Sequence, residues 1–412
     1  FQRSGVLVCT LVIAGFMSLS GSMALGETEG APLAVSSTHI EQAVWKAFSP
    51  DSLAHTDEYT VELPPFPEPV SVTVKGDALF VDFPESILSH IGELYLRELF
   101  HHISEAIPDY NAISQINLTC KGKHLSEYLP PTVSYGEAPA PVFRPLSPGT
   151  GLAGRNISIG PSHGRYWNGS GWFWQRSDPC GAGEAVLEDT NSIRLMQYLH
   201  QYLAQDGAVV HVPRQMDESD CCHDATGLPW WKMAARYWLQ HQGLPSWVWD
   251  SSTTDYNDDI RARPLYADFR GSDIYISHHT NAGGGGTGTG TETYRDSKME
   301  KTAHIANSLS LANAVHNSII SHIRNTYDAG WANRGVKDSA GAFGEIRIPN
   351  RPAILIELAF HDNCSKDVQY LTDDFFRSLS QWAIYKGVCD YFGVTPTWDK
   401  YSCELVSDSI PD

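Results

Sequence analysis

The sequence predicts an α/β fold, a sheet flanked by helices, with a small α+β domain before it. Apolar, β-branched runs that predict strands alternate with stretches in which apolar residues recur at helical spacing. The expected strands cover 156–160, 208–212, 273–277 and 353–358, and the expected helices cover about 189–204, 299–325 and 372–391. A layered fold of this kind places its ligand site at the carboxyl ends of the strands.

The small α+β domain is expected at residues 66–137. Apolar and polar residues alternate from 70 to 74, a turn follows at 75–77, and a second strand continues at 79–81. A helical pattern and a third strand near Ile116 complete a ββαβ-like order. Because this region contains no cluster of catalytic residue types, we expect a structural or docking module that folds separately from the rest of the chain.

The first residues have the pattern of a signal peptide. The basic Arg3 precedes a short apolar core at 5–16, and Ser22-Met23-Ala24 offers a cleavage site between small residues, which predicts a signal peptide at 1–26. No other segment approaches ~20 uninterrupted apolar residues, so we expect an exported protein without stable membrane insertion after cleavage. We also expect a linker with extended segments at 27–65, a second linker at 138–153 and a tail at 396–412.

The net charge disfavours two classes of partner, and the cysteine content allows disulfides. The formal net charge is −19, from 48 acidic and 29 basic residues, and a field of this sign disfavours nucleic acids and anionic surfaces. One of the eight cysteines lies in the signal peptide, and the seven others are an odd number that cannot pair completely. Disulfides are allowed in an exported protein, but the sequence indicates neither their connectivity nor an oligomeric state.

Four residues with metal or acid–base chemistry fall at element ends or in an apolar strand. His163 follows the first expected strand, Glu188 opens the next helix, and His279 follows the strand at 273–277. Taken singly, a histidine there is more often a loop residue, and an acid in a first helical turn is favoured by the helix dipole. Glu357, however, lies within an apolar strand, where an unpaired charge would cost several kcal/mol. Together they match a catalytic zinc site, which has three protein ligands and an open position for water.

In their order along the chain, these motifs resemble those of the zinc-dependent N-acetylmuramoyl-L-alanine amidases of the type 3 class, which cleave peptidoglycan. The motifs that carry the resemblance are Ser162-His163-Gly164, Glu188, Ser277-His278-His279-Thr280-Asn281-Ala282 and Pro352-Ala-Ile-Leu-Ile-Glu357. The resemblance implies a catalytic domain at 154–395, built on a twisted mixed sheet flanked by helices. More faintly, Gly76-Asp-Ala-Leu-Phe-Val-Asp82 makes the 66–137 region similar to the accessory domain of sporulation and germination proteins.

The resemblance also implies the roles of individual residues. His163, Glu188 and His279 are the implied ligands of one Zn²⁺, and Glu357 is the implied catalytic carboxylate. Within the histidine pair, alternation along a strand points His278 to the opposite face.

Three further residues have roles that are less fixed. Glu184 is an alternative to the ligand at position 188 because it lies nearby in the chain. Asn281 and Arg334 are candidates for orienting the substrate.

The implied reaction is zinc-dependent hydrolysis of the amide bond between N-acetylmuramic acid and L-alanine. Its setting would be the periplasm, the cell envelope or the extracellular space, and its partner would be peptidoglycan. Two alternatives remain: a zinc peptidase or carboxypeptidase acting on the stem peptide, and an inactive cell-wall-binding regulator with the same fold. The tryptophan-rich segment at 215–267 is interpreted either as a packed helix and loop or as a lid over the substrate groove.

Overall fold

The computed structural model describes residues 35–49, 63–130, 132 and 151–398. The predicted signal peptide, most of the second linker and most of the tail lie outside the described residues. All described residues belong to one compact unit. Within them, no helix combines the length and the apolar character needed to cross a membrane.

The centre of the fold is a mixed sheet of ten strands, which confirms the predicted mixed sheet flanked by helices. Its order is β1-β2-β3-β11-β10-β12-β9-β5-β8, with β4 paired to β3. The strands are β1 Ser71–Lys75, β2 Ala78–Asp82, β3 Gln115–Cys120, β4 Lys123–His124, β5 Asn156–Pro161, β8 Val209–His211, β9 Ile274–Asn281, β10 Thr291–Arg295, β11 Asn333–Asp338 and β12 Ala353–Phe360. Strands β12, β9, β5 and β8 are parallel, whereas β10 is antiparallel to β12. A separate ribbon consists of β6 Tyr166–Trp167 and β7 Trp172–Phe173.

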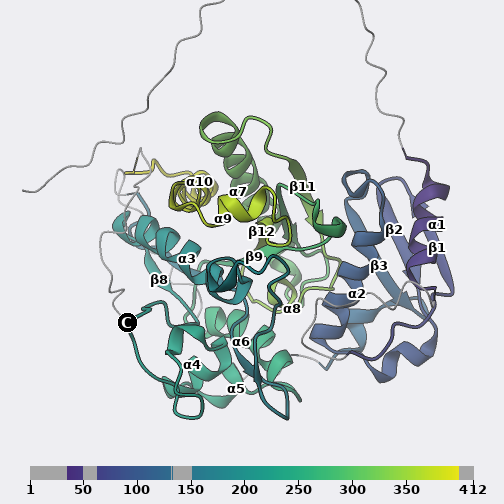
Figure 1. The fold of residues 1–412 in the computed structure, drawn as a ribbon, viewed down its shortest axis with the longest axis horizontal. Coiled ribbons are helices and arrows are strands. Elements are labelled where there is room, and N and C mark those ends of the chain that lie inside the picture. The colour runs from purple at the N-terminus through teal and green to yellow at the C-terminus, as the bar shows by residue number, and fades with distance from the viewer. Residues whose placement is uncertain (1–34, 50–62, 131, 133–150, 399–412) are drawn as a thin grey trace, which may run out of the picture. The chain divides into compact units, whose positions relative to one another are not determined.

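Helices cover both faces of this sheet (Figure 1). They are α1 Ser37–Ala47, α2 Glu93–Ala106, α3 Glu188–Gln205, α4 Ala235–His241, α5 Ser246–Trp249, α6 Asp255–Phe269, α7 Ile305–Thr326, α8 Gly344–Arg347, α9 Asp367–Leu371 and α10 Asp374–Phe392. Short 3-10 turns are η2 Glu85–Ser89, η3 Tyr110–Ala112, η4 Leu125–Tyr128, η5 Gly183–Ala185, η6 Trp230–Lys232, η7 Gly284–Gly286 and η8 Thr302–His304. Helices α3 and α7 pack on the sheet and α10 packs on both of them, while α6 and α8 pack on β9 and β12 from the other side.

Strand β12 separates two cores because its side chains alternate between the two faces. Ile354 and Ile356 join the first core, which includes buried residues of α3, α7 and α10. Ala353 and Leu355 join the second core, which includes Phe100 of α2. All eight residues of β12 are buried, as expected for a central strand that is covered on both faces.

Most of the expected elements are confirmed within a few residues, but two boundaries differ. The strand expected at 273–277 continues to Asn281, because β5 pairs with it as far as His278 and β12 pairs with it as far as Asn281. The histidine pair therefore lies inside a strand and not in the loop that the sequence suggested. The helix expected at 299–325 begins at Ile305, after the turn η8.

The prediction of extended linker structure at 27–65 is wrong for α1. Ser36 caps this helix by accepting a hydrogen bond from a backbone N–H, and residues at i, i+4 spacing form its buried face. These residues are Ile40 and Val44, and Phe48 continues the spacing at the C-cap; all three belong to the second core. Burial of that stripe holds the helix in place despite the polar residues around it.

The predicted small domain has the expected ββαβ order, but it is not separate from the rest of the fold. Strand β3 pairs with β11, and the second core contains residues from both sides of position 154. The ring of Phe100 on α2 lies 4.9 Å from that of Phe343, and the hydroxyls of Tyr110 and Tyr294 are 2.8 Å apart. The limits 66–137 and 154–395 stay predictions, whereas the expectation of separate folding is not met.

A candidate metal centre at the strand ends

The candidate site forms where three adjacent parallel strands end. Strands β5, β9 and β12 lie side by side, so their carboxyl ends meet at one edge, in agreement with the expected position of a ligand site. His163 comes two residues after β5, and the register pairs Glu357 of β12 with His279 of β9. Glu188 is the first residue of α3, which packs on β5 and β9.

The chain turns sharply at His163 to bring its ring into the site. His163 has a φ of 57°, a left-handed conformation that costs a non-glycine residue energy and that proteins keep mainly at functional sites. Gly164 follows with a φ of 122°, and a Cβ there would lie 2.6 Å from the backbone of Ala234. Asp189 accepts a hydrogen bond from the N–H of Gly164 at 2.9 Å, which fixes the turn to α3.

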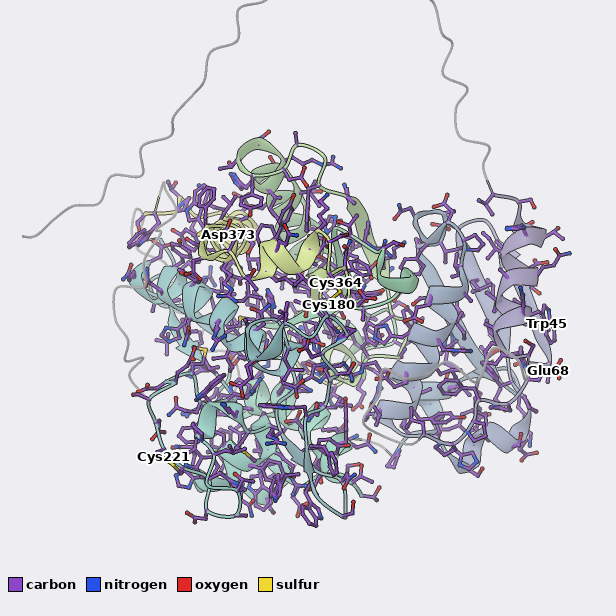
Figure 2. The ribbon with its side chains drawn as sticks, in the orientation of Figure 1. Trp45, Glu68, Cys180, Cys221, Cys364 and Asp373 are labelled. Carbon is purple, nitrogen blue, oxygen red and sulfur yellow. A yellow bond between two sulfur atoms is a disulfide. The ribbon has the colours of Figure 1, made fainter. Side chains whose placement is uncertain are left out.

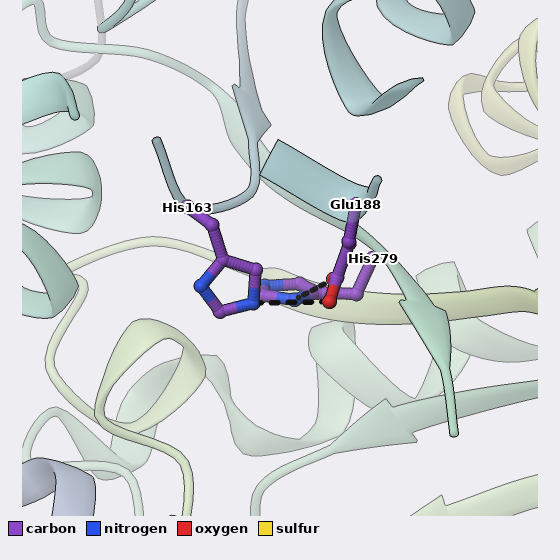
Figure 3. A group of neighbouring side chains, drawn as sticks. All are labelled: His163, Glu188 and His279. Carbon is purple, nitrogen blue, oxygen red and sulfur yellow. Dashed lines mark hydrogen bonds and ion pairs between the residues drawn. The ribbon is translucent and has the colours of Figure 1, made fainter. Parts of the chain in front are cut away.

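His163, Glu188 and His279 converge in space (Figure 3). One ligand atom from each residue lies within 4.8 Å of the others. Glu188 Oε1 is 2.8 Å from His279 Nδ1, and Glu188 Oε2 is 3.3 Å from His163 Nε2. All three side chains are buried, so the carboxylate has little access to water.

The outer nitrogen of each imidazole has its own acceptor. Gln175 Nε2 donates to Asp259 Oδ2 at 3.0 Å, which leaves Gln175 Oε1 to accept from Nδ1–H of His163 at 2.8 Å. His279 Nε2 lies 3.2 Å from a carboxylate oxygen of Glu345. This pattern, in which the inner nitrogen is free for a metal and the outer one donates, is common around protein metal sites.

The ionisation of the cluster also fits a cation. Burial lowers the pKa of His163 well below its usual range, and Arg176 adds to the effect, so its ring is neutral. A neutral ring that donates through Nδ1 carries a lone pair on Nε2, which therefore faces a carboxylate oxygen of Glu188 without a proton between them. A cation between two such acceptors relieves this contact, and an imidazole–carboxylate set of this kind suits Zn²⁺.

His279 and Glu188 hold charge in the absence of a metal. Burial alone would lower the pKa of His279, but the carboxylates of Glu345 and Glu188 raise it to about 9. Burial opposes the charge of Glu188 as well, yet the protonated ring of His279 lowers the pKa of Glu188 well below the usual range. A metal ion would replace the proton on His279.

Glu357 lies beside the cluster and is 4% exposed. Its Oε2 has no hydrogen-bond partner among the described residues. Burial raises the pKa of Glu357 to about 8, with His279 opposing the shift and Glu188 adding to it. A carboxyl group in this state can exchange a proton near neutral pH.

The other residues singled out in the sequence fall in different places. Glu184 is outside the cluster, where its carboxylate pairs with Lys232 at 2.6 Å. His278 faces away from the cluster and lies 3.0 Å from Gln381 on α10. Asn281 lines the cavity at the site and donates to Glu292 Oε1 at 2.6 Å.

Arg334 lies outside the cluster. Its Nε is 3.3 Å from Oε2 of Glu292, the same carboxylate that Asn281 contacts. Sequence reasoning assigned no role to Glu292, although it stands in the Gly290-Thr-Glu-Thr-Tyr294 stretch shortly after the histidine motif. Gln175 and Glu345 were also missed, and no local pattern marks either one.

The cluster opens into a cavity. Its lining includes Glu188, His279 and Glu357 from the site. Other lining residues come from α2, before position 154, and these are Arg97, His101 and Glu105. A second cavity shares Glu105, Asn281 and Ala282 with the first and is also lined by Arg334.

The tryptophan-rich segment at 215–267 does not cover this opening. Trp230 and Trp238 are buried in a cluster with Tyr166 and Tyr256, and none of the segment's tryptophans lines either of the two cavities. Trp247 packs on a neighbouring cluster. The packing interpretation is favoured over the lid.

A disulfide joins Cys180 to Cys364 (Figure 2). Cys180 belongs to the loop that carries Gln175 and Arg176 toward α3, and Cys364 follows β12. The bond therefore ties the loop before Glu188 to the chain that comes after the strand of Glu357.

Comparison with known proteins gives a consistent result. The family model described as N-acetylmuramoyl-L-alanine amidase matches residues 157–390. No curated protein matches the chain. The CwlD amidase from Clostridioides difficile, solved in complex with the GerS lipoprotein, is 19% identical; the match covers 58% of this chain and 98% of that one, with a TM-score of 0.38.

Two other solved structures are similar to the same extent. The apo form of the amidase Ami1 from Mycobacterium abscessus is 17% identical over 58% of this chain and 100% of that one, with a TM-score of 0.39. The catalytic domain of the amidase CwlV from Bacillus (Paenibacillus) polymyxa is 19% identical over 58% of this chain and 99% of that one, with a TM-score of 0.37.

Proposed function

Because the chain belongs to the N-acetylmuramoyl-L-alanine amidase family, we propose that it hydrolyses the bond between N-acetylmuramic acid and L-alanine at the His163–Glu188–His279 cluster, with one zinc ion. The family assignment carries the reaction and its substrate, peptidoglycan. The observation that carries the choice of site is the convergence of these three buried side chains beside Glu357.

In this proposal the three side chains hold the metal, with His163 Nε2, His279 Nδ1 and the carboxylate of Glu188 as the ligand atoms. Gln175 and Glu345 fix the two rings through their outer nitrogens. Zinc at this position would polarise the amide carbonyl and lower the pKa of water toward ~7.

Glu357 is proposed as the proton carrier. It lines the cavity next to His279, and its unpaired oxygen is available to take a proton from the attacking water. The same carboxyl would then give that proton to the leaving nitrogen of L-alanine. Its raised pKa supports both steps, because a carboxyl that titrates near neutral pH can accept a proton in its ionised form and return it in its protonated form.

Asn281 and Arg334 are proposed to position the substrate. Both are tied to Glu292, and they line the second cavity, which continues from the metal site. We also propose that the protein acts outside the cytoplasm, and the Cys180–Cys364 disulfide supports export because such bonds persist in oxidising compartments.

The test is digestion of purified sacculi followed by mass spectrometry of the new chain ends. Free L-alanine amino groups are expected. Shortened stem peptides would instead identify a peptidase, and undigested sacculi from zinc-loaded protein would identify a binding protein without activity.

A further inference from the structure

We propose that Arg97 and Arg176 form a binding site for a carboxylate of the stem peptide, next to the scissile amide. This inference rests on the proposed function and adds the part of the substrate that the enzyme selects. The proposed site gives α2 a role in substrate selection, although α2 lies before the residues that the family model matches.

Arg97 reaches the site from α2 and lines the metal-site cavity. Its side chain is 4% exposed, and its Nη1 has no hydrogen-bond partner among the described residues. The nearest carboxylate to that nitrogen is Glu345, at 3.9 Å, which is too far for a hydrogen bond. A buried guanidinium with an unused donor is costly unless a ligand satisfies it.

Arg176 approaches the same cavity from the loop before α3. The hydroxyl of Tyr256 accepts from Arg97 Nη2 at 3.0 Å and from Arg176 Nη1 at 2.9 Å. Glu98 Oε1 lies 3.2 Å from Arg97 and 3.4 Å from Arg176. Tyr256 and Glu98 therefore hold the two guanidinium groups together at the wall of the cavity.

The charges around this pair favour an anionic ligand. The two guanidinium groups share Glu98. Glu345, near Arg97, also pairs with Arg263 at 3.1 Å. Glu188 lies 3.4 Å from Arg176, where the proposed zinc would take up its charge. The chain as a whole carries −19 and repels acidic stems at long range, so their binding requires a local cationic site. Arginine suits this task because its planar donors match a carboxylate.

The test compares two soluble substrates that differ in one group. N-acetylmuramoyl-L-alanyl-D-isoglutamate has a free carboxylate after L-alanine, and its isoglutamine counterpart has a carboxamide there. The measured quantity is the ratio of kcat/KM for the acid to kcat/KM for the amide, because this ratio is independent of the fraction of folded protein. We expect the parent to prefer the acid by about tenfold or more, as for a buried charged pair.

Variants then assign the preference to the two arginines. Arg97→Gln and Arg176→Gln should each bring the ratio close to one, and Arg97→Lys should keep part of it. The matched control is Arg261→Gln, which removes a buried ion pair of 3.0 Å between α6 and Glu93 of α2 without touching the cavity. This control should lower the melting temperature and leave the ratio as in the parent.

The outcomes separate the two proposals. A parent that cleaves both substrates at the muramoyl–alanine bond with a ratio near one overturns the carboxylate site and leaves the amidase function standing. The carboxylate site is also overturned if Arg97→Gln and Arg176→Gln both keep the parental ratio, or if Arg261→Gln loses it. Failure of the parent to cleave this bond in either substrate or in sacculi overturns the proposed function, and the carboxylate site with it.

Discussion

Breaking the Cys180–Cys364 disulfide should destabilise the whole fold and not only the loop that it holds. The two cysteines are 184 residues apart, so the bond closes a long loop in the unfolded chain. For a loop of this length, the chain-entropy relation gives roughly 5 kcal/mol at about 25 °C, and native disulfides contribute about 2–5 kcal/mol when removed. We therefore expect Cys180→Ser combined with Cys364→Ser to lower the free energy of unfolding by about 3–5 kcal/mol.

The corresponding shift in melting temperature follows from the chain length. At ~2.1 cal/mol/K per residue, a chain of 412 residues has an unfolding entropy of ~0.9 kcal/mol/K. The double variant should then melt roughly 3–6 °C below the parent. Urea unfolding followed by tryptophan fluorescence checks the free energy, and a thermal melt without reductant checks the temperature.

Reductant provides the matched control. It should lower the stability of the parent to that of the double variant. The double variant itself should change little, because its remaining disulfide, Cys221–Cys222, joins adjacent residues and closes almost no loop. If the parent and the double variant unfold at the same urea concentration without reductant, the bond does not constrain the unfolded chain and the reasoning fails.

Four further results are expected. Glu357→Gln should keep the zinc content and melting temperature while turnover on sacculi falls by roughly 10²-fold; near-normal turnover would contradict its role as proton carrier. By elemental analysis, the parent should hold about one zinc ion per chain, His279→Ala should lose it and His278→Ala should keep it. Loss of zinc from His278→Ala but not from His279→Ala would make His278 the ligand. Phe100→Ala should cost about 3–5 kcal/mol in a single unfolding transition, and two separate transitions would show that α2 unfolds apart from the sheet. Burial lowers the pKa of Lys337 to about 8 from the usual 10.5. Between these two pH values the unfolded chain binds more protons than the folded chain, so this group makes the free energy of unfolding rise with pH. Lys337→Met should lack that rise when free energies of unfolding are compared across this pH range.

The sequence predicted best those parts of the fold in which one local pattern decides the structure. The alternating or continuous apolar runs of β5, β9 and β12 mark buried strands whatever surrounds them. Alternation also separates the two neighbouring histidines, and the structure places His279 in the cluster and His278 against α10. The helix α3 begins at Glu188, within one residue of the expected start.

The parts that sequence reasoning missed depend on contacts between distant residues. Glu345 supports His279 from 66 positions away, and Gln175 supports His163 only after a loop has folded back. Arg97 reaches the site through the packing of α2, which no pattern near the histidine motifs indicates. The expectation of a separate small domain failed for a similar reason. Apolar residues at helical spacing predict a helix, but they do not show which sheet that helix will cover.

Residues on both sides of position 154 share one core, and this limits how the protein can be truncated or combined with parts of other proteins. Phe100, Tyr294 and Phe343 form one aromatic cluster, with ring centroids 4.9–5.8 Å apart, to which both parts of the chain contribute. A fragment that begins at position 154 would expose the rings of Tyr294 and Phe343 to water, and such an apolar face promotes aggregation. An exchange of the first part between relatives would have to bring rings of matching shape. The two parts therefore fold as a single unit, and a substitution in α2 would also change the lining of the cavity at the candidate metal centre.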